Sequence, residues 1–154
     1  MRLSLFLVVS LLSVALISCS SETDTAAVPD NAAFLEKAAS EPGAVKTPSG
    51  LVYRELKPGT GASPSATDTV TMQYRGTLTD GTEFDSSFKR NEPLKAPLNR
   101  LIPCWVGGVQ KMKVGGKSKL VCPSDIAYGP QGSPPVIPGG ATLVFEVELL
   151  GVGN

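Results

Sequence analysis

The chain has 154 residues, and its 14 lysine and arginine residues balance 14 aspartate and glutamate residues, so it carries no net charge at pH 7. No basic stripe stands out, and a nucleic-acid partner is therefore not expected. The sequence has no histidine, which excludes a Ser-His-Asp triad, a Cys-His pair and most zinc sites; we expect neither a metal nor a cofactor.

Residues 1–18 have the pattern of a secretory signal peptide. Arg2 precedes an apolar run from Leu3 to Ile17, which is too short for a transmembrane helix. The run ends in L-I-S-C, which resembles a bacterial lipobox, so Cys19 is expected to be the lipidated first residue of the mature chain. Ordinary secretion and an uncleaved anchor are the alternatives. Ser20 in place of aspartate favours the outer membrane, on its periplasmic side, where several acyl chains would hold the protein firmly.

Residues 19–46 are expected to be a lipidated N-terminus, a flexible tether and a short helix, followed by one folded domain over residues 47–154. Ser20 to Asp30 is polar and rich in small residues, as flexible spacers are. Asn31 to Ser40 has high helix propensity and begins with a residue able to cap a helix. This helix is too short to be stable alone.

The stretch from Val70 to Ser87 predicts a β-hairpin. Apolar and polar residues alternate strictly along Val70 to Leu78, as in a strand with one buried face. Asp80-Gly81 then predicts a tight turn with two positive φ values. The hairpin brings Tyr74, Phe84 and Asp85 toward one face, and aromatic walls with one acid indicate a pocket for an apolar ligand.

The remainder predicts further strands and one helix. Leu51 to Lys57 is a short strand, and the prolines between Phe88 and Asn99 allow only an edge strand or irregular structure there. Pro103 favours the first turn of a helix that buries Trp105, although the Gly107-Gly108 pair within it has no explanation in the sequence. Two further alternating strands, Lys117 to Cys122 and Thr142 to Leu150, flank a loop rich in proline and glycine. A twisted antiparallel sheet wrapped on one short helix, in the α+β class, is the architecture that this pattern permits.

Cys104 and Cys122 remain if Cys19 is lipidated. In an oxidising periplasm they are candidates for a disulfide, and two buried thiols are the alternative.

Six motifs between Thr47 and Leu150 resemble those of the FKBP-type peptidyl-prolyl isomerases. They are P-S-G-L, Y-x-G-x-L-x-D-G-x-x-F-D-S-S, L-I-P-x-W, M-K-V-G-G-K, D-I-A-Y-G and A-T-L-V-F-E-V-E-L-L, in that order. The resemblance implies an FKBP-like fold, a half-barrel around one helix, and the N-terminus suggests a bacterial Mip-like lipoprotein. Mip-like members carry a long dimerising helix ahead of the domain; here it is nearly absent, so a monomer is expected.

The resemblance also implies a site. Tyr74, Phe84 and Phe145 would form its sides, and Trp105 its floor beneath the substrate proline. Leu94, Leu101 and Ile102 would complete the rim, and the Ile102 N–H and the Tyr128 hydroxyl would donate to substrate carbonyls. Asp85 would lie beside the rotating carbonyl, paired with Arg90. Val136 and Ile137 would lie in the loop that overhangs the site. Taken singly, the aromatic residues could be ordinary core, the tyrosines could stabilise loops, and Asp85 could stabilise a turn.

Three residues depart from the family pattern. Leu94 stands where many relatives have an aromatic residue, Cys104 replaces a common glycine, and Ser133 stands where some relatives have histidine. The leading hypothesis is a peptidyl-prolyl isomerase at the cell envelope that acts on proline-containing exported polypeptides and binds macrolide inhibitors. The alternatives are a non-catalytic chaperone or binding module that uses the same pocket, and a structural lipoprotein that has lost the pocket.

Overall fold

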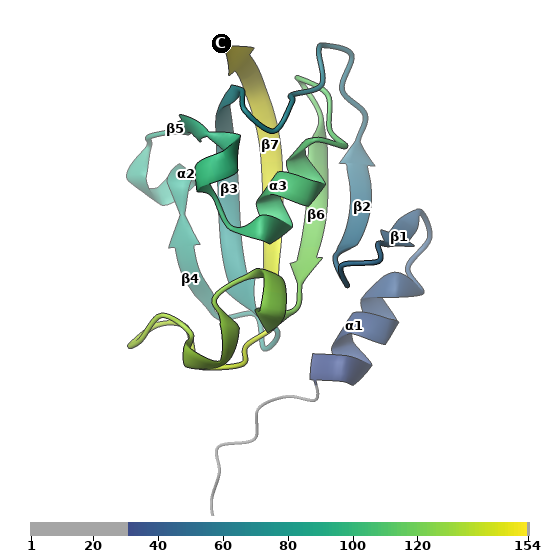
Figure 1. Cartoon of the computed structure of the whole chain (residues 1–154), viewed down its shortest axis with the longest axis vertical. Coiled ribbons are helices and arrows are strands. Elements are labelled where there is room, and N and C mark those ends of the chain that lie inside the picture. The colour runs from purple at the N-terminus through teal and green to yellow at the C-terminus, as the bar shows by residue number, and fades with distance from the viewer. Residues whose placement is uncertain (1–30, 154) are drawn as a thin grey trace, which may run out of the picture.

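The computed structural model describes residues 31–153. Seven antiparallel strands form one sheet in the order β1-β2-β6-β7-β3-β4, with β5 also paired to β3 (Figure 1). The strands are β1 (Ala44–Lys46), β2 (Val52–Lys57), β3 (Thr69–Leu78), β4 (Glu83–Ser86), β5 (Leu94–Pro97), β6 (Lys117–Cys122) and β7 (Leu143–Gly153). The helices are α1 (Asn31–Ala39), α2 (Ser87–Arg90) and α3 (Pro103–Val109), with short 3-10 turns at η1 (Leu98–Arg100), η2 (Ser124–Ile126) and η3 (Gly129–Gln131). The predicted α+β class is confirmed.

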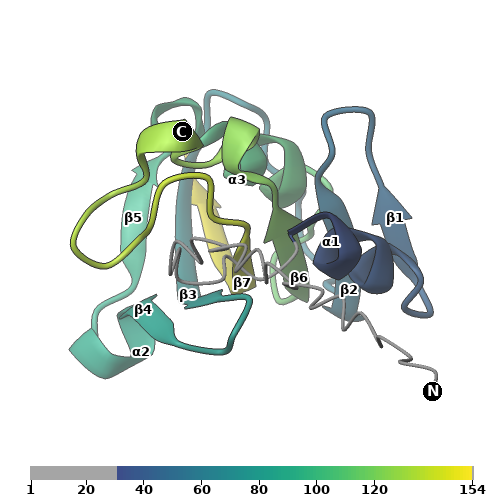
Figure 2. The same ribbon diagram turned by 90° about the horizontal axis from the view of Figure 1, so that it is seen from below.

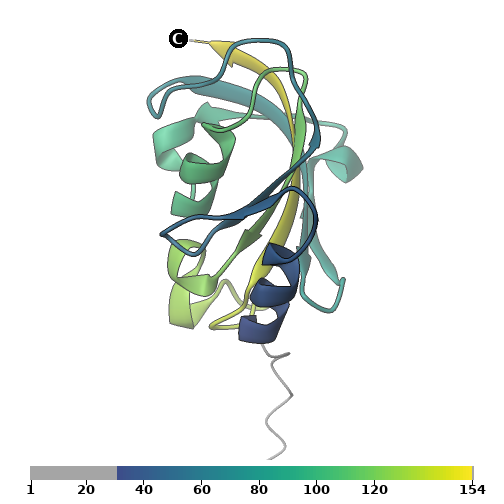
Figure 3. The same ribbon diagram turned by 90° about the vertical axis from the view of Figure 1, so that its right-hand side faces the viewer.

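β3 and β7 form the centre of the sheet and pair from Thr69–Gly153 at one end to Leu78–Leu143 at the other. Every second residue is buried from Val70 to Gly76 in β3 and from Leu143 to Leu149 in β7, as the alternation predicts. Figure 3 shows α3 lying across the concave side of the curved sheet. The main core fills the space between them and includes Val70, Met72, Trp105, Val109, Leu120, Leu143, Phe145, Val147 and Leu149.

α1 covers part of the opposite face of the sheet. Ala38 packs with Val52 and Val121, and Phe34 and Leu35 adjoin them. This contact explains why Val121 is buried although it points away from Leu120 and Cys122. The predicted helix is confirmed, but Asn31 does not cap it. Its side chain instead bonds to the chain just before β7. The sheet also begins at Ala44, three residues before the boundary that the sequence suggested.

The hairpin between β3 and β4 differs from the predicted turn. Leu78 N–H donates to Thr82 O at 2.8 Å across a loop of three residues, and Gly81 has a φ of +89° while Asp80 does not have positive φ. One left-handed residue closes a loop of three, whereas a two-residue type I′ turn needs two. The expectation of two positive φ values was therefore wrong.

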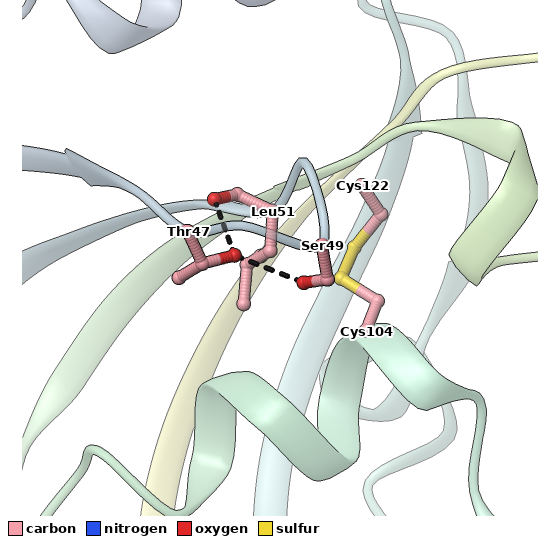
Figure 4. Close-up of a disulfide and its surroundings, with 5 residues drawn as sticks. All are labelled: Thr47, Ser49, Leu51, Cys104 and Cys122. Carbon is pink, nitrogen blue, oxygen red and sulfur yellow. Dashed lines mark hydrogen bonds between the residues drawn. A yellow bond between two sulfur atoms is a disulfide. The ribbon is translucent and has the colours of Figure 1, made fainter.

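α3 is held close to β6 by two features of its sequence. Cys104 and Cys122 form a disulfide with their Cα atoms 5.8 Å apart (Figure 4), within the range usual for such bonds. One turn further along α3, a Cβ added to Gly108 would lie 2.7 Å from a methyl group of Leu120. Gly108 is therefore required by the close approach of helix and strand; nothing in the structure explains Gly107.

The turn before β2 lies beside this disulfide. The Thr47 hydroxyl donates to Leu51 O at 3.1 Å and lies 2.9 Å from the hydroxyl of Ser49 (Figure 4). Within the described residues, no helix is long and apolar enough to cross a bilayer. The proposed lipidation residue, Cys19, and residues 1–30 in general lie outside the part of the chain that the structure describes.

Candidate active site

A cavity of about 130 Å³ opens between α3 and the sheet. Nine side chains from separate parts of the chain line it, and the sequence analysis named all nine as site residues. They are Tyr74, Phe84, Asp85, Leu94, Leu101, Ile102, Trp105, Tyr128 and Phe145. Because Asp85 is the sole charged residue among the nine, the cavity suits an apolar group.

Trp105 is placed by α3 beneath the cavity and is 5% exposed. Its ring packs edge-on against Tyr74, at 4.9 Å between centroids, and against Phe145, at 5.1 Å. Such perpendicular contacts are favourable for aromatic pairs and restrict each ring to one orientation. Within residues 31–153 the buried indole N–H of Trp105 has no acceptor.

The two phenylalanine walls meet over a glycine. Phe84 and Phe145 contact edge-to-face at 5.6 Å between centroids. A Cβ built on Gly76 would lie 2.6 Å from the Phe84 ring and 2.9 Å from the Phe145 ring. Gly76 thus leaves the space in which both rings lie. The sequence analysis missed this role, although a glycine on the apolar face of an alternating strand was the available signal.

Gly76→Ala is therefore expected to displace both rings, because β3 is paired on both sides at this point and cannot shift. We expect a loss of roughly 1–3 kcal/mol in the free energy of unfolding, as in other overpacked cores, together with weaker binding of apolar ligands in the cavity. Urea denaturation and ligand titration measure both. Gly151→Ala is the matched control, since the nearest atom there is 4.0 Å away; equal effects in the two variants would contradict the prediction.

Asp85 lies at the cavity edge in a network with Tyr74 and Arg90. The Tyr74 hydroxyl donates to one carboxylate oxygen of Asp85, and Arg90 pairs with the other. Arg90 also donates to the Tyr74 hydroxyl at 2.8 Å and lies over the Tyr74 ring, with 5.6 Å from its Cζ atom to the centroid. Each carboxylate oxygen is engaged, so the Asp85 side chain is held in one orientation at the cavity edge.

The pKa values of Tyr74 and Arg90 are both raised, for different reasons. Burial is the main cause of the raised pKa of Tyr74, and the hydrogen bond to Asp85 adds to it. The pKa of Arg90 is raised first by its bond to Tyr74 and then by Asp85. Tyr74 therefore remains neutral and Arg90 charged at any physiological pH.

Ser87 supports the network from beneath and was not singled out from the sequence. It is fully buried at the start of α2. Its hydroxyl accepts a hydrogen bond from the Tyr74 backbone N–H at 2.8 Å and donates to the Gln73 side chain. Ser87 thereby ties β3 to the segment that carries Asp85 and Arg90. Its presence in the D-S-S part of the motif was the signal that could have found it.

Two hydrogen-bond donors at the rim are free within the described residues. The Ile102 backbone N–H has no acceptor, while the Ile102 carbonyl accepts the first bonds of α3 from Trp105 and Val106. The Tyr128 hydroxyl likewise makes no hydrogen bond, and its side chain is 42% exposed. Burial raises the pKa of Tyr128, with a smaller contribution from Asp85, so this hydroxyl keeps its proton.

Residues 61–150 match the family model of the FKBP-type peptidyl-prolyl cis-trans isomerases. The chain belongs to this family.

Individual FKBP relatives agree. FKBP-type peptidyl-prolyl cis-trans isomerase FkpA from Aeromonas hydrophila is 53% identical over 119 residues, which are 77% of this chain and 44% of the relative. Outer membrane protein MIP from Legionella longbeachae is 42% identical over 120 residues, 78% of this chain and 52% of the relative. The crystal structure of FkpA from Escherichia coli matches with a TM-score of 0.77 at 47% identity, over 80% of this chain and 57% of that one. The chain thus spans about half the length of these FKBP relatives.

Three other residues that the FKBP resemblance suggested do not line the cavity. Arg90 acts on it through Asp85 and Tyr74. Val136 is 53% exposed on the loop between η3 and β7. Ile137, only 4% exposed, belongs to the core cluster and is not among the residues that line the cavity. In the part of the chain that the structure describes, no three side chains are grouped so as to hold a metal ion.

Proposed function

We propose that this chain is a peptidyl-prolyl cis-trans isomerase that acts on proline-containing polypeptides at the cell envelope. The observation that carries the proposal is the convergence of eight apolar, aromatic and donor residues and one carboxylate, Asp85, on a single cavity. Rotation about an X–Pro bond has a barrier of about 18–20 kcal/mol and breaks no covalent bond. A catalyst therefore needs to bind the twisted amide more tightly than the planar one.

Each part of the cavity has a role in this proposal. The substrate proline ring rests on Trp105 between Tyr74 and Phe145. The free Ile102 N–H and Tyr128 hydroxyl hold substrate carbonyls on either side of the rotating bond. Removal of water disfavours the charge-separated resonance form of the amide, which is the form that resists rotation. Asp85 supplies a fixed charge beside the rotating carbonyl, held there by Tyr74 and Arg90.

An isomerase assay on a short peptide with one X–Pro bond, read by NMR exchange without a coupling protease, tests the proposal. We expect the folded protein to accelerate the slow interconversion and a macrolide to inhibit it, because both ligands require the same apolar cavity. Binding of the peptide without acceleration would instead identify a proline-binding module. Heat-denatured protein provides the background rate.

The activity is expected to be independent of pH between about pH 6 and about pH 9, because the chain has no histidine and its site tyrosines stay neutral there. The pKa of each of the three tyrosines is raised by burial in the folded chain. Their contribution to stability is complete below about pH 10, and it is lost as the pH rises further, because the unfolded chain gives up these protons first. Turnover and urea midpoints measured across this range check both statements; a bell-shaped profile centred near neutrality would contradict the first.

The proposal also includes attachment to the outer membrane through Cys19. The lipobox-like L-I-S-C sequence, the relative named as an outer membrane protein and the Cys104–Cys122 disulfide, which suits an oxidising compartment, support it. Cys19→Ala is expected to move the protein from the membrane fraction to the soluble periplasmic fraction and to abolish incorporation of labelled fatty acid. Membrane association that survives the substitution would refute lipidation.

We further propose that the protein is a monomer. α1 has nine residues and places its apolar side chains against its own sheet, so this helix has no long apolar face left for a second copy. Light scattering of the Cys19→Ala protein in buffer without detergent gives its mass, and the mass of a dimer would refute the proposal.

A further inference from the structure

Asn31 joins α1 to the loop that leads out of the active site. Its Nδ2 donates to the carbonyl of Gly140 at 2.8 Å, and its Oδ1 accepts from the N–H of Thr142 at 3.4 Å. Both partners lie 109 or more residues away in the sequence. Thr142 is 2% exposed, so its N–H lies away from water. One amide side chain therefore satisfies two backbone groups at the end of this loop.

The same loop begins at Tyr128, and its two ends are bonded to each other. Gly140 N–H donates to Gly129 O at 3.0 Å, and Gly132 N–H donates to Tyr128 O at 3.2 Å. Hydrogen bonds and one peptide link thus run without a gap from Asn31 through Gly140 and Gly129 to Tyr128. Figure 2 views the end of the molecule at which α1 and this loop lie.

Tyr128 depends on its backbone for its position. Its hydroxyl has no hydrogen-bond partner within residues 31–153, and the side chain is half-exposed at the rim. Ile126 and Ala127 pack against the core just before it, whereas the bonds of the closed loop hold the chain just after it. A shift at Gly140 would therefore move the Tyr128 hydroxyl relative to the rest of the cavity.

Several contacts fix α1, and with it Asn31, against the sheet. Ala38 is buried against Val52 and Val121. Just after α1, Glu41 bonds to Lys119 at 2.8 Å and to Arg54 at 2.5 Å, and Lys119 is the main cause of its lowered pKa. The helix cannot slide along the sheet without breaking these contacts.

We infer that Asn31 is a positioning residue for Tyr128. Through Asn31, helix α1 on the far face of the sheet determines where the Tyr128 hydroxyl lies and therefore how well it can donate to a substrate carbonyl. The inference rests on the proposed isomerase function. It assigns to the segment that precedes the catalytic domain a role in substrate binding in addition to its packing against the sheet.

Kinetics of Asn31→Ala test this. Loss of both bonds is expected to raise KM roughly threefold to tenfold and to leave kcat within about twofold, because a hydrogen bond to the bound substrate is weakened while Trp105 and Asp85 keep their places. Asn31→Asp retains the acceptor for Thr142 but sets a carboxylate oxygen against the Gly140 carbonyl oxygen, so its KM should rise at least as much as that of Asn31→Ala. Lys37→Ala is the control, since this exposed side chain of the same helix has no side-chain partner in the described chain.

A double-mutant cycle separates positioning from general destabilisation. In a Tyr128→Phe background no hydroxyl remains to be misplaced, so Asn31→Ala should raise KM no further. Unchanged KM in Asn31→Ala, or additive effects of the two substitutions, would overturn the inference.

The NMR chemical shifts of backbone amides provide a test that does not depend on activity. The Tyr128 and Gly129 signals should shift in Asn31→Ala and stay in place in Lys37→Ala. If the wild-type protein showed no turnover, the proposed function would fail alone, and these signals would still decide whether Asn31 positions Tyr128. Unshifted signals would overturn the inference.

Discussion

Asp85→Val is expected to lower kcat/KM by roughly tenfold to a hundredfold, because it removes the fixed charge and leaves the buried Tyr74 hydroxyl and the Arg90 guanidinium without their shared acceptor. The free energy of unfolding should fall by roughly 1–2 kcal/mol, because the buried Tyr74 hydroxyl loses its acceptor, while the partly exposed pair of Asp85 and Arg90 adds little. Isomerase kinetics and urea denaturation of the same preparation give the two values.

Two companion variants separate charge from shape. Asp85→Asn keeps an oxygen for the Tyr74 hydroxyl and removes the charge, so it should fall between wild type and Asp85→Val. Asp125→Val is the matched control, because Asp125 is exposed and its side chain makes no hydrogen bond or ion pair within the described part of the chain. Wild-type kcat/KM in Asp85→Val would remove Asp85 from the mechanism, and a large loss of stability would assign it a structural role instead.

Replacing both Cys104 and Cys122 with alanine is expected to cost about 3 kcal/mol in the free energy of unfolding. The two cysteines are 18 residues apart, and cross-linking a loop of this length restricts the unfolded chain by about that amount. Kinetic constants well below the melting temperature should change less, because Trp105 stays packed between Tyr74 and Phe145.

Wild-type protein with a reductant serves as the comparison for the double variant. Its urea midpoint should fall to that of the double variant, while the double variant should not respond to reductant at all. Coinciding midpoints for oxidised wild type and the double variant would show that the disulfide adds no stability.

The sequence predicted the parts of the fold that depend on local patterns. Alternation along β3 and β7 located the buried face correctly, and Pro103 located the start of α3. The cavity could not be predicted from local patterns, because the spacing of residues does not show that Tyr128 and Tyr74 line the same cavity. Only the resemblance of several motifs to one family grouped all nine lining residues.

Long-range contacts account for what the sequence left unpredicted. Gly108 is explained by Leu120, which packs against α3 from β6 and follows it by 12 residues in the sequence. The family resemblance placed Ile137 in the loop overhanging the site, and the burial of its side chain depends on how that loop packs against the core, which no local pattern indicates. The docking of α1 did have a local signal. Leu120, Val121 and Cys122 form a continuous apolar run, which is typical of a strand covered on both faces.

The central place of β7 determines when the domain can assemble. Residues 143–153 pair with β3 on one side and β6 on the other, and Phe145 comes from this strand. While a growing polypeptide still lacks this segment, the two halves of the sheet have nothing to join them and the cavity lacks the wall that Phe145 provides. Such a precursor should stay unfolded until its last strand is available.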